Sequence, residues 1–338
     1  MNEKSAFNRR QWLKMGLAGA AGTVLAAGCE TQSSQSSTVG GEMDTVCDVS
    51  PRQELGPFPP MKALSQPDHD VDLTLVNGQS VSAEGEVILV KGKVLDTACN
   101  PVEGAIVLIW QANHHGKYHH EMDLSDRPED PHFQGWGQAI TNAQGEYQFK
   151  TIVPGLYTGR TRHIHFKISR KGYHEMVTQM YFEGEEQNAT DSLLNQLTHE
   201  EQQRLICGFD RSGEFPAATF NINLEKVQTG SVPETVLQEY AGSYQMTLPE
   251  DHPFMKFMRE VGVKDENIVF EVSHEGRQLF LQGTSAPKAE VFWISKDKFN
   301  AMAYYSANLV FLRNEQGKVS TIRFESEMNG ILEALKII

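Results

Sequence analysis

Two histidines and two tyrosines near the middle of the chain have the residue types and the spacing of a metal site. His163 and His165 lie in the run from Arg160 to Ile168, in which polar and apolar residues alternate. Successive side chains of an extended strand point to opposite faces, so both imidazoles share one face while the apolar residues face a core. Tyr118 and Tyr157 precede this strand, and loops could bring their hydroxyls to the same ion.

This set of donors favours ferric iron. Fe(III) is a hard ion that prefers anionic oxygen donors and accepts imidazole as a borderline partner. A tyrosine with an ordinary pKa of about 10 ionises only where a strong cation offsets the cost. Two tyrosinates would keep the iron ferric, so we expect it to activate an organic substrate that binds as a dianion. That chemistry points to a catechol.

The elements that must position these residues are short strands separated by turns. Gly92 to Asp96, Ala105 to Trp110 and Gly145 to Lys150 have the composition of strands. Asn100-Pro101 and Asn142 to Gly145 supply the turn residues between them. The spacing predicts a mainly β protein whose catalytic domain is an antiparallel β-sandwich.

One helix is expected in this region, at about residues 190 to 205, where leucines recur at near-helical spacing. Thr190 or Asp191 is the expected cap of this helix. Four aromatic residues are interpreted as core rather than as a platform for a substrate: Trp110, Trp136, Tyr147 and Phe149.

A second set of short strands follows from about residue 230. Residues 236 to 244 open this set, and Glu315 to Lys318 is typical of a hairpin turn. The opening resembles the small lipocalin-like β-domain of exported bacterial hydrolases. No cluster of histidines or cysteines and no nucleophile motif follows it. We therefore divide the folded chain into a catalytic domain, residues 46–228, and an accessory β-domain, residues 231–338.

The N-terminus has the features of an export signal. Arg9 and Arg10 precede a weakly apolar, Ala/Gly-rich run from Met15 to Gly28, which ends at Cys29. Residues 1–28 resemble a twin-arginine (Tat) lipoprotein signal peptide, in which Cys29 is the lipidated residue. An uncleaved membrane anchor is the alternative, but the apolar run is short for a spanning helix. The expected location is the bacterial periplasm or cell surface, with membrane attachment through the lipid.

Residues 29–45 are rich in Ser, Gln, Thr and Gly and are expected to form a flexible tether. Three cysteines then remain, Cys47, Cys99 and Cys207, an odd number for an oxidising compartment. One disulfide and one buried thiol would account for them, but the sequence does not assign the pair.

Length and net charge limit the classes of protein to which this chain could belong. A chain of 338 residues favours two folded units. It has 44 acidic against 30 basic residues and a net charge of -14, which argues against a nucleic-acid partner. Whether the protein forms a homo-oligomer is left open.

Ordered runs of residues around the four metal-ligand candidates resemble the intradiol ring-cleavage dioxygenases, most of all the branch that is similar to protocatechuate 3,4-dioxygenase. The resemblance covers about residues 46 to 225, and the N-terminal signal places it with exported lipoproteins. Glu54 to Pro59 is similar to the family's Glu-Gly-Pro-Phe-Tyr-Pro segment, with Leu55 inserted and the tyrosine absent. The other matching runs are Gly92 to Asp96, Pro101 to Ala105, Trp110 to Asn113, Gly116 to Tyr118, Gly145 to Phe149 and Gly159 to Phe166.

The resemblance implies a non-haem Fe(III) site with Tyr118 and His163 as equatorial ligands and Tyr157 and His165 as axial ligands. A catechol would displace Tyr157, so this tyrosine has a catalytic role as well. The ring would then be cleaved by O2 between the two hydroxylated carbons to give a cis,cis-muconate-type diacid.

Two further site residues follow from the resemblance. Arg160 corresponds to the family arginine that stabilises negative charge on the substrate ring, and Gln179 to the glutamine near that arginine. The stretch from Tyr157 to His163 is short, as in the exported members, and implies an open pocket. The identity of the catechol does not follow from the resemblance.

Two other functions compete with this one. A non-catalytic, transthyretin-like β-sandwich binding lipoprotein would explain the strand residues but not the paired histidines and tyrosines. A metal-buffering protein would use a histidine-rich loop, which we instead interpret as facing solvent: His114, His115, His119 and His120.

Overall fold

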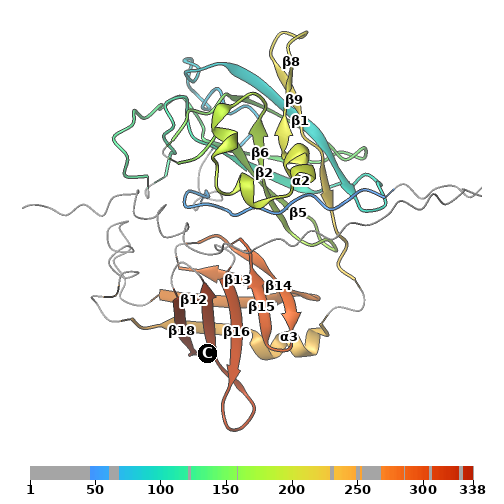
Figure 1. Ribbon diagram of the computed structural model, residues 1–338, viewed down its shortest axis with the longest axis vertical. Coiled ribbons are helices and arrows are strands. Elements are labelled where there is room, and N and C mark those ends of the chain that lie inside the picture. Colours follow the sequence, from blue (N-terminus) through green and yellow to red (C-terminus); the bar gives the residue numbers. More distant parts are fainter. Residues whose placement is uncertain are drawn as a thin grey trace, which may run out of the picture.

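A computed structural model describes residues 46–60, 68–120, 123–157, 159–228, 232–248, 252, 268–284, 286–303, 307–326 and 330–337. The predicted signal peptide (residues 1–28), Cys29 and the tether to residue 45 lie outside these residues. Within them, no helix is both long and apolar enough to cross a membrane. The described chain forms a β-sandwich and a separate β-barrel (Figure 1).

The sandwich contains two sheets of five described strands each. The first sheet consists of β1 (Val87–Asp96), β4 (Glu146–Ile152), β8 (Phe209–Asp210), β9 (Ala217–Thr219) and β10 (Ile222–Leu224). The second sheet has the order β3-β2-β5-β6-β7, with β2 (Ile106–Trp110), β3 (Trp136–Ile140), β5 (His163–Ser169), β6 (Met176–Phe182) and β7 (Ile206–Cys207). The predicted mainly β fold is confirmed.

The long strand pairs are antiparallel, and the short strands β7, β9 and β10 add parallel pairs at the sides. Alternate residues of β1 are buried, as expected for a strand with one face on a core. The core between the sheets takes side chains from both, including Val90, Phe149 and Phe166, which are fully buried.

The prediction of a single helix at residues 190 to 205 is wrong in its extent. Two short helical segments, η2 (Leu194–Gln196) and α2 (His199–Leu205), occupy this range, and η1 (Glu186–Ala189) precedes it. Thr198 interrupts the run, because its side chain and Glu201 form a capping box that begins α2. The leucine spacing reflected packing on the sandwich rather than one continuous helix.

The C-terminal domain is a closed barrel in which each described strand pairs with its neighbours in sequence and β11 closes on β18. This up-and-down order is that of lipocalins, so the predicted lipocalin-like β-domain is confirmed as a barrel. Its strands are β11 (Gly242–Met246), β12 (Ile268–Glu275), β13 (Gln278–Gly283), β14 (Ala289–Ser295), β15 (Lys298–Ala301), β16 (Ala307–Arg313), β17 (Val319–Ser326) and β18 (Gly330–Lys336).

A short helix precedes the barrel. Residues 236 to 240, expected to begin the strands, instead belong to α3 (Glu234–Tyr240). Its Tyr240 is buried against Phe299 and Phe311, with ring centroids 5.2 and 4.5 Å apart, and donates a hydrogen bond to Asp297. The helix therefore packs into the barrel core, where aromatic side chains fill the space.

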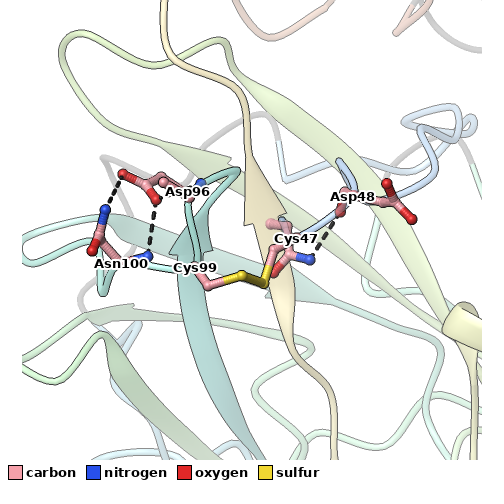
Figure 2. Close-up of a disulfide and its surroundings, with 7 residues drawn as sticks. Cys47, Asp48, Asp96, Cys99 and Asn100 are labelled. Atoms are coloured by element: carbon pink, nitrogen blue, oxygen red, sulfur yellow. Dashed lines mark hydrogen bonds between the residues drawn. A yellow bond between two sulfur atoms is a disulfide. The ribbon is translucent and has the colours of Figure 1, made fainter. Parts of the chain in front are cut away.

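A disulfide links the first described residues to the sandwich. Cys47 is bonded to Cys99, which lies in the turn after β1 (Figure 2). The Asp96 side chain accepts hydrogen bonds from the backbone N–H groups of Ala98 and Asn100 and so holds that turn. Cys207 is the free and buried cysteine of the described chain, which resolves the pairing that the sequence left open.

Candidate metal centre

Four side-chain donor atoms converge at one end of the second sheet. His163 Nε2 lies 3.1 Å from His165 Nε2, 3.2 Å from the Tyr157 hydroxyl and 3.4 Å from the Tyr118 hydroxyl. First-row metal ions hold nitrogen and oxygen ligands at about 2 Å, so neighbouring ligands of one ion lie roughly 3 Å apart. The structure thus brings the four predicted ligands to distances that suit a shared metal ion.

The donor set contains two histidines and two phenols and is unlike a site built on carboxylates or thiols. Among the described residues, no group of three or more His, Cys, Asp or Glu side chains is arranged to hold a metal. The four residues found here contain only two such side chains, so they form a site of another type. Tyrosinate donors favour a hard trivalent cation such as Fe(III) over zinc or copper.

The strand β5 fixes the two imidazoles. His163 and His165 lie on the same face of β5, and both are buried. The backbone carbonyl of Thr161 lies 2.7 Å from Nδ1 of His163. Because a carbonyl can only accept, Nδ1 carries the proton and Nε2 presents a lone pair to the site.

An indole ring holds the second imidazole in place. Trp110, directly opposite His165 on β2, stacks on it with centroids 4.8 Å apart and an interplanar angle of 4°. Trp110 and Trp136 belong to the cluster that includes Tyr118, separate from the sandwich core. The core interpretation holds for all four aromatic residues: Tyr147 and Phe149 lie in the sandwich core, and the two tryptophans are buried in the second cluster, where Trp110 also contacts His165.

Two loops carry the tyrosines. Tyr118 follows β2, and its backbone N–H donates a hydrogen bond to the Asp123 side chain at 2.9 Å. Gly116 in the same loop has φ +78° and approaches Leu156, so that an added Cβ would lie 2.2 Å from the Leu156 carbonyl oxygen. This close contact joins the loop of Tyr118 to the loop of Tyr157, and the two rings meet edge to face at 5.5 Å.

The protonation states of the four donors suit a cation. Burial and the Arg160 charge hold the pKa of His163 well below its ordinary value. Burial, His163 and Arg160 do the same for the pKa of His165, so both imidazoles are neutral at physiological pH. Burial raises the pKa of Tyr118 and of Tyr157. The protein alone therefore keeps both phenols protonated, and only a bound cation would ionise them.

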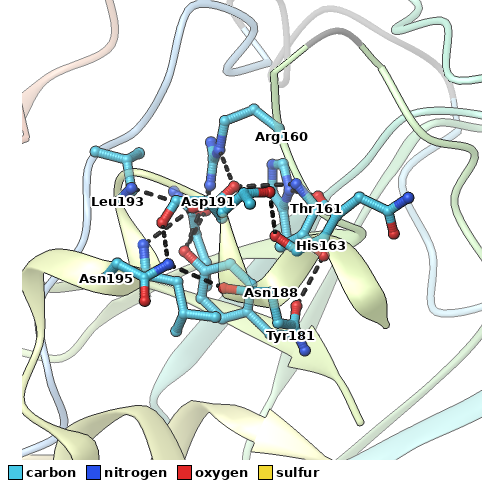
Figure 3. Close-up of polar contacts among 12 residues, drawn as sticks. Arg160, Thr161, His163, Tyr181, Asn188, Asp191, Leu193 and Asn195 are labelled. Carbon is cyan, nitrogen blue, oxygen red and sulfur yellow. Dashed lines mark hydrogen bonds and ion pairs between the residues drawn. The ribbon is translucent and has the colours of Figure 1, made fainter. Parts of the chain in front are cut away.

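Arg160 and Gln179 lie beside the donors and contact each other. Arg160 Nη2 donates to Gln179 Oε1 at 2.8 Å. Arg160 Nε donates to Asp191 Oδ2 at 2.8 Å (Figure 3). Gln179 is the partner of His165 across β5 and β6. The two residues predicted from the family resemblance thus form one polar group at the edge of the site.

Asp191 is a positioning residue whose role the sequence did not reveal. It was expected as a helix cap, and its Oδ1 does accept from the backbone N–H groups of Leu193 and Leu194. Its Oδ2 accepts from Thr161 N and from Arg160. One buried carboxylate therefore ties the η2 turn to the start of β5 (Figure 3).

The segment from Glu54 to Pro59 forms another wall of the site. A Cβ on Gly56 would lie 3.1 Å from Cε1 of His165, and the glycine has φ +71°. Phe58 packs on Tyr118 with ring centroids 4.8 Å apart. Burial raises the pKa of Glu54 to about 7, although the Arg160 charge lowers it. The sequence pointed to this segment through its resemblance to the family. Only the structure shows which site residues the segment contacts.

The histidine-rich loop does not form a second site among the described residues. His114 and His119 are exposed, while His115 and His120 are partly buried. His115 pairs with Glu84 at 2.9 Å, and His119 lies 4.0 Å from Glu129. These are separate contacts rather than one ligand set.

Comparisons with known proteins place the chain in a family. A family model described as Dioxygenase matches residues 60–227. The protocatechuate 3,4-dioxygenase beta chain of Burkholderia cepacia is 38% identical over 167 residues, which span 47% of this chain and 70% of that protein. A catechol 1,2-dioxygenase of Candida albicans is 33% identical over 110 residues, which span 27% of this chain and 35% of that protein. This chain belongs to the intradiol ring-cleavage dioxygenase family.

A solved structure of the same class was also found. It is the dioxygenase domain of a dioxygenase and carbohydrate-binding protein fusion from Streptomyces sp. SirexAA-E, with 31% identity and a TM-score of 0.41. The match covers 53% of this chain and 100% of that domain. The barrel strands, from Gly242 to Lys336, lie outside the residues matched by the family model.

Proposed function

We propose that this chain is a non-haem Fe(III) intradiol dioxygenase that cleaves a catechol with O2 between its two hydroxylated carbons. The product would be a cis,cis-muconate-type diacid. Tyr118, Tyr157, His163 and His165 would hold the iron. The observation that carries the proposal is that the hydroxyls of Tyr118 and Tyr157 and the Nε2 atom of His165 all lie within 3.4 Å of His163 Nε2.

Bound Fe(III) would supply the positive charge that ionises the phenols and the substrate and that makes the catecholate ring reactive toward O2. The residues around it have their own tasks. Thr161 keeps the His163 proton on Nδ1, which leaves the other ring nitrogen free to bind. Tyr157 is only partly buried, so its phenolate would be suited to leave the metal and to become a neutral phenol by accepting one proton from the incoming catechol.

The apolar side chains beside the four donors suit a flat aromatic substrate. Leu55, Phe58 and Trp110 are buried together with Tyr118. In this apolar setting the Arg160 guanidinium would stabilise negative charge on the ring more strongly than it would in water. The class of substrate is therefore a catechol, with O2 as the second substrate.

We also propose that the protein is exported and attached to the membrane through a lipid on Cys29. The twin arginines, the apolar run and the cysteine at its end support this location. The bond between Cys47 and Cys99 supports it too, since disulfides persist in oxidising compartments. The -14 net charge suits a small-molecule enzyme and not a nucleic-acid binder.

Iron content, visible absorption and O2 uptake test the function together. The purified protein, reconstituted with Fe(III), should be coloured by tyrosinate-to-iron charge transfer and should consume O2 with a catechol. A panel of catechol, protocatechuate, hydroxyquinol and larger plant catechols would then define the substrate. A colourless protein that takes up no iron would refute the proposal and leave the non-catalytic binding lipoprotein as the better reading.

A further inference from the structure

One face of the second sheet carries both the candidate metal site and the contact with the barrel. His163, His165 and Lys167 alternate onto the same face of β5. Lys167 Nζ donates a hydrogen bond to the Lys288 carbonyl of the barrel. Two residues along a strand span about 7 Å, so the barrel docks close to the proposed ligands. In Figure 1, β13 and β14 form the side of the barrel nearest to the sandwich.

Two buried carboxylates join the domains. The backbone N–H of Glu175 donates to Glu290 Oε2 at 2.6 Å, and that of Glu290 donates to Glu175 Oε1 at 3.2 Å. Lys167 pairs with Glu175 at 3.2 Å and His174 with Glu290 at 2.7 Å. Buried charges need such partners, and separation of the domains would break every contact between Glu290 and the sandwich. The barrel is therefore bound to the sandwich close to the site.

Arg52 lies in the seam between the domains. Its guanidinium donates to the Glu175 carbonyl and lies over the Phe292 ring, 4.2 Å from the centroid. The cavity left between Arg52, Glu290 and Phe292 measures only about 10 Å³. The barrel thus holds Arg52 by ring stacking and close packing.

Arg52 begins the segment that covers the metal site. The next residue, Gln53, donates its backbone N–H to the Val177 carbonyl at 2.8 Å. The carbonyl of Glu54 accepts from Gln179 Nε2 at 3.1 Å. These bonds fasten the segment along β6, from the barrel contact toward the histidines.

The far end of the same segment touches the proposed iron ligands. Gly56 packs against His165, and Phe58 packs on Tyr118. Two barrel alanines, Ala289 and Ala303, are buried in the cluster that contains Phe58 and Tyr118. A displacement at Arg52 would therefore reach the ligands within six residues of chain.

We propose that the barrel is a positioning domain for the dioxygenase site, and that Arg52, held by Phe292 and Glu175, is the positioning residue that transmits its effect. The proposal rests on the function proposed above, because it states what the barrel does for that reaction. It assigns the C-terminal domain a part in catalysis without placing any of its residues on the substrate.

Two variants test the contacts of Arg52 with Phe292 and Glu175, which we call the clamp. Phe292→Leu removes the ring under Arg52 and keeps an apolar side chain in the barrel, whereas Arg52→Lys keeps the charge and removes the planar guanidinium. Hydrogen exchange of the backbone amides from Gln53 to Phe58 is measured on the full-length, iron-free protein. We expect exchange to accelerate by about three- to tenfold, the change that loss of a cation–π contact predicts. With iron bound, the charge-transfer band should shift and kcat should fall more than KM rises.

The matched control is Trp293→Leu, the next residue of β14, whose side chain is 57% exposed. This variant should change neither the hydrogen exchange of the segment from Gln53 to Phe58 nor the charge-transfer band of the iron-loaded protein. Unchanged exchange in both test variants would overturn the clamp. Faster exchange with an unaltered iron spectrum and unaltered kcat and KM would overturn the catalytic role. A wild-type protein with no iron band and no O2 uptake would instead refute the proposed function, and the exchange data would still decide the clamp.

Discussion

The carboxylate of Asp191 accepts a hydrogen bond from Nε of Arg160 at 2.8 Å, and the Asp191 side chain is fully buried. The same oxygen accepts from the backbone N–H of Thr161. This carboxylate therefore fixes both the direction of the guanidinium and the residue whose carbonyl orients His163. One acidic side chain thus controls the charge and the geometry on one side of the site.

Asp191→Asn is expected to destabilise the fold and to lower activity. Breaking a buried ion pair leaves Arg160 uncompensated and costs about 3 kcal/mol. A misdirected guanidinium should lower kcat/KM by about a hundredfold. Urea unfolding and O2 uptake would measure the two effects, with Asp210→Asn, at the exposed last residue of β8, as the control. A variant with wild-type kcat/KM would show that Arg160 needs no such partner.

Tyr118→Phe and Tyr157→Phe should each weaken the colour of the iron-loaded protein, because each removes one phenolate from the metal. Tyr157→Phe should also lower turnover, since the proton acceptor is lost. Tyr147→Phe is the control: Tyr147 is buried as Tyr118 is, and its hydroxyl donates to the Phe220 carbonyl, away from the site. It should lose stability and keep its absorption spectrum. A visible spectrum unchanged by both site substitutions would contradict the ligand assignment.

Gly56→Ala is expected to weaken iron binding. The new methyl group would meet the His165 ring at 3.1 Å, in a backbone conformation with φ +71°. Gly184→Ala provides the control, because Gly184 has φ +82° and nothing within 4 Å of a Cβ. Both variants should lose about 1 kcal/mol of stability from the left-handed conformation. Only Gly56→Ala should also lose iron in a competition assay with a chelator, and equal iron retention would count against the contact.

Glu54 should make the stability of the iron-free protein depend on pH. Burial raises the pKa of its carboxyl to about 7, whereas an unfolded glutamate titrates at about 4.3. Between these values the folded state binds the proton and the unfolded state does not, so the free energy of unfolding falls as pH rises through the window. Glu54→Gln should remove this loss of stability, which amounts to at most roughly 4 kcal/mol.

Urea unfolding of the wild type and of Glu54→Gln at a series of pH values from about 4 to about 8 measures this difference. Glu186→Gln, at an exposed position of η1, is the control and should follow the wild type. Parallel curves for the wild type and Glu54→Gln would place the pKa of Glu54 near its ordinary value.

The export proposal has its own test. Arg9→Lys combined with Arg10→Lys should hold the protein in the cytoplasm, because the Tat route requires the arginine pair. Cys29→Ser should release the exported protein from the membrane fraction. Cell fractionation with an antibody would follow both variants. Unchanged export of the double lysine variant would indicate the Sec route instead.

The metal site was predictable because its main signal is local. The alternation around His163 and His165 determines a strand face without any knowledge of the rest of the fold. Trp110 was correctly expected to be buried, but an apolar aromatic residue on a strand gives no sign of the residue it packs against. Only its register opposite His165 places it beside the site.

Helices and long-range contacts were harder to predict. The leucines between residues 193 and 205 have helical spacing, but Thr198 begins a new helix within them. Residues 236 to 240 could pack as strand or helix, and burial of Tyr240 in the barrel selected the helix. The contact of Arg52 with Phe292 joins residues 240 positions apart in the sequence, and no local pattern encodes such a pair.

The bond between Cys47 and Cys99 has a mechanical consequence. It joins the chain just ahead of Arg52 to the turn after β1, a long strand at the centre of the first sheet. A force pulling on the residues before Cys47 would pass through the disulfide into that sheet and bypass the segment that covers the metal site. If the N-terminus is attached to a membrane as proposed, a force from that attachment would act on the first sheet and would not directly distort the catalytic site.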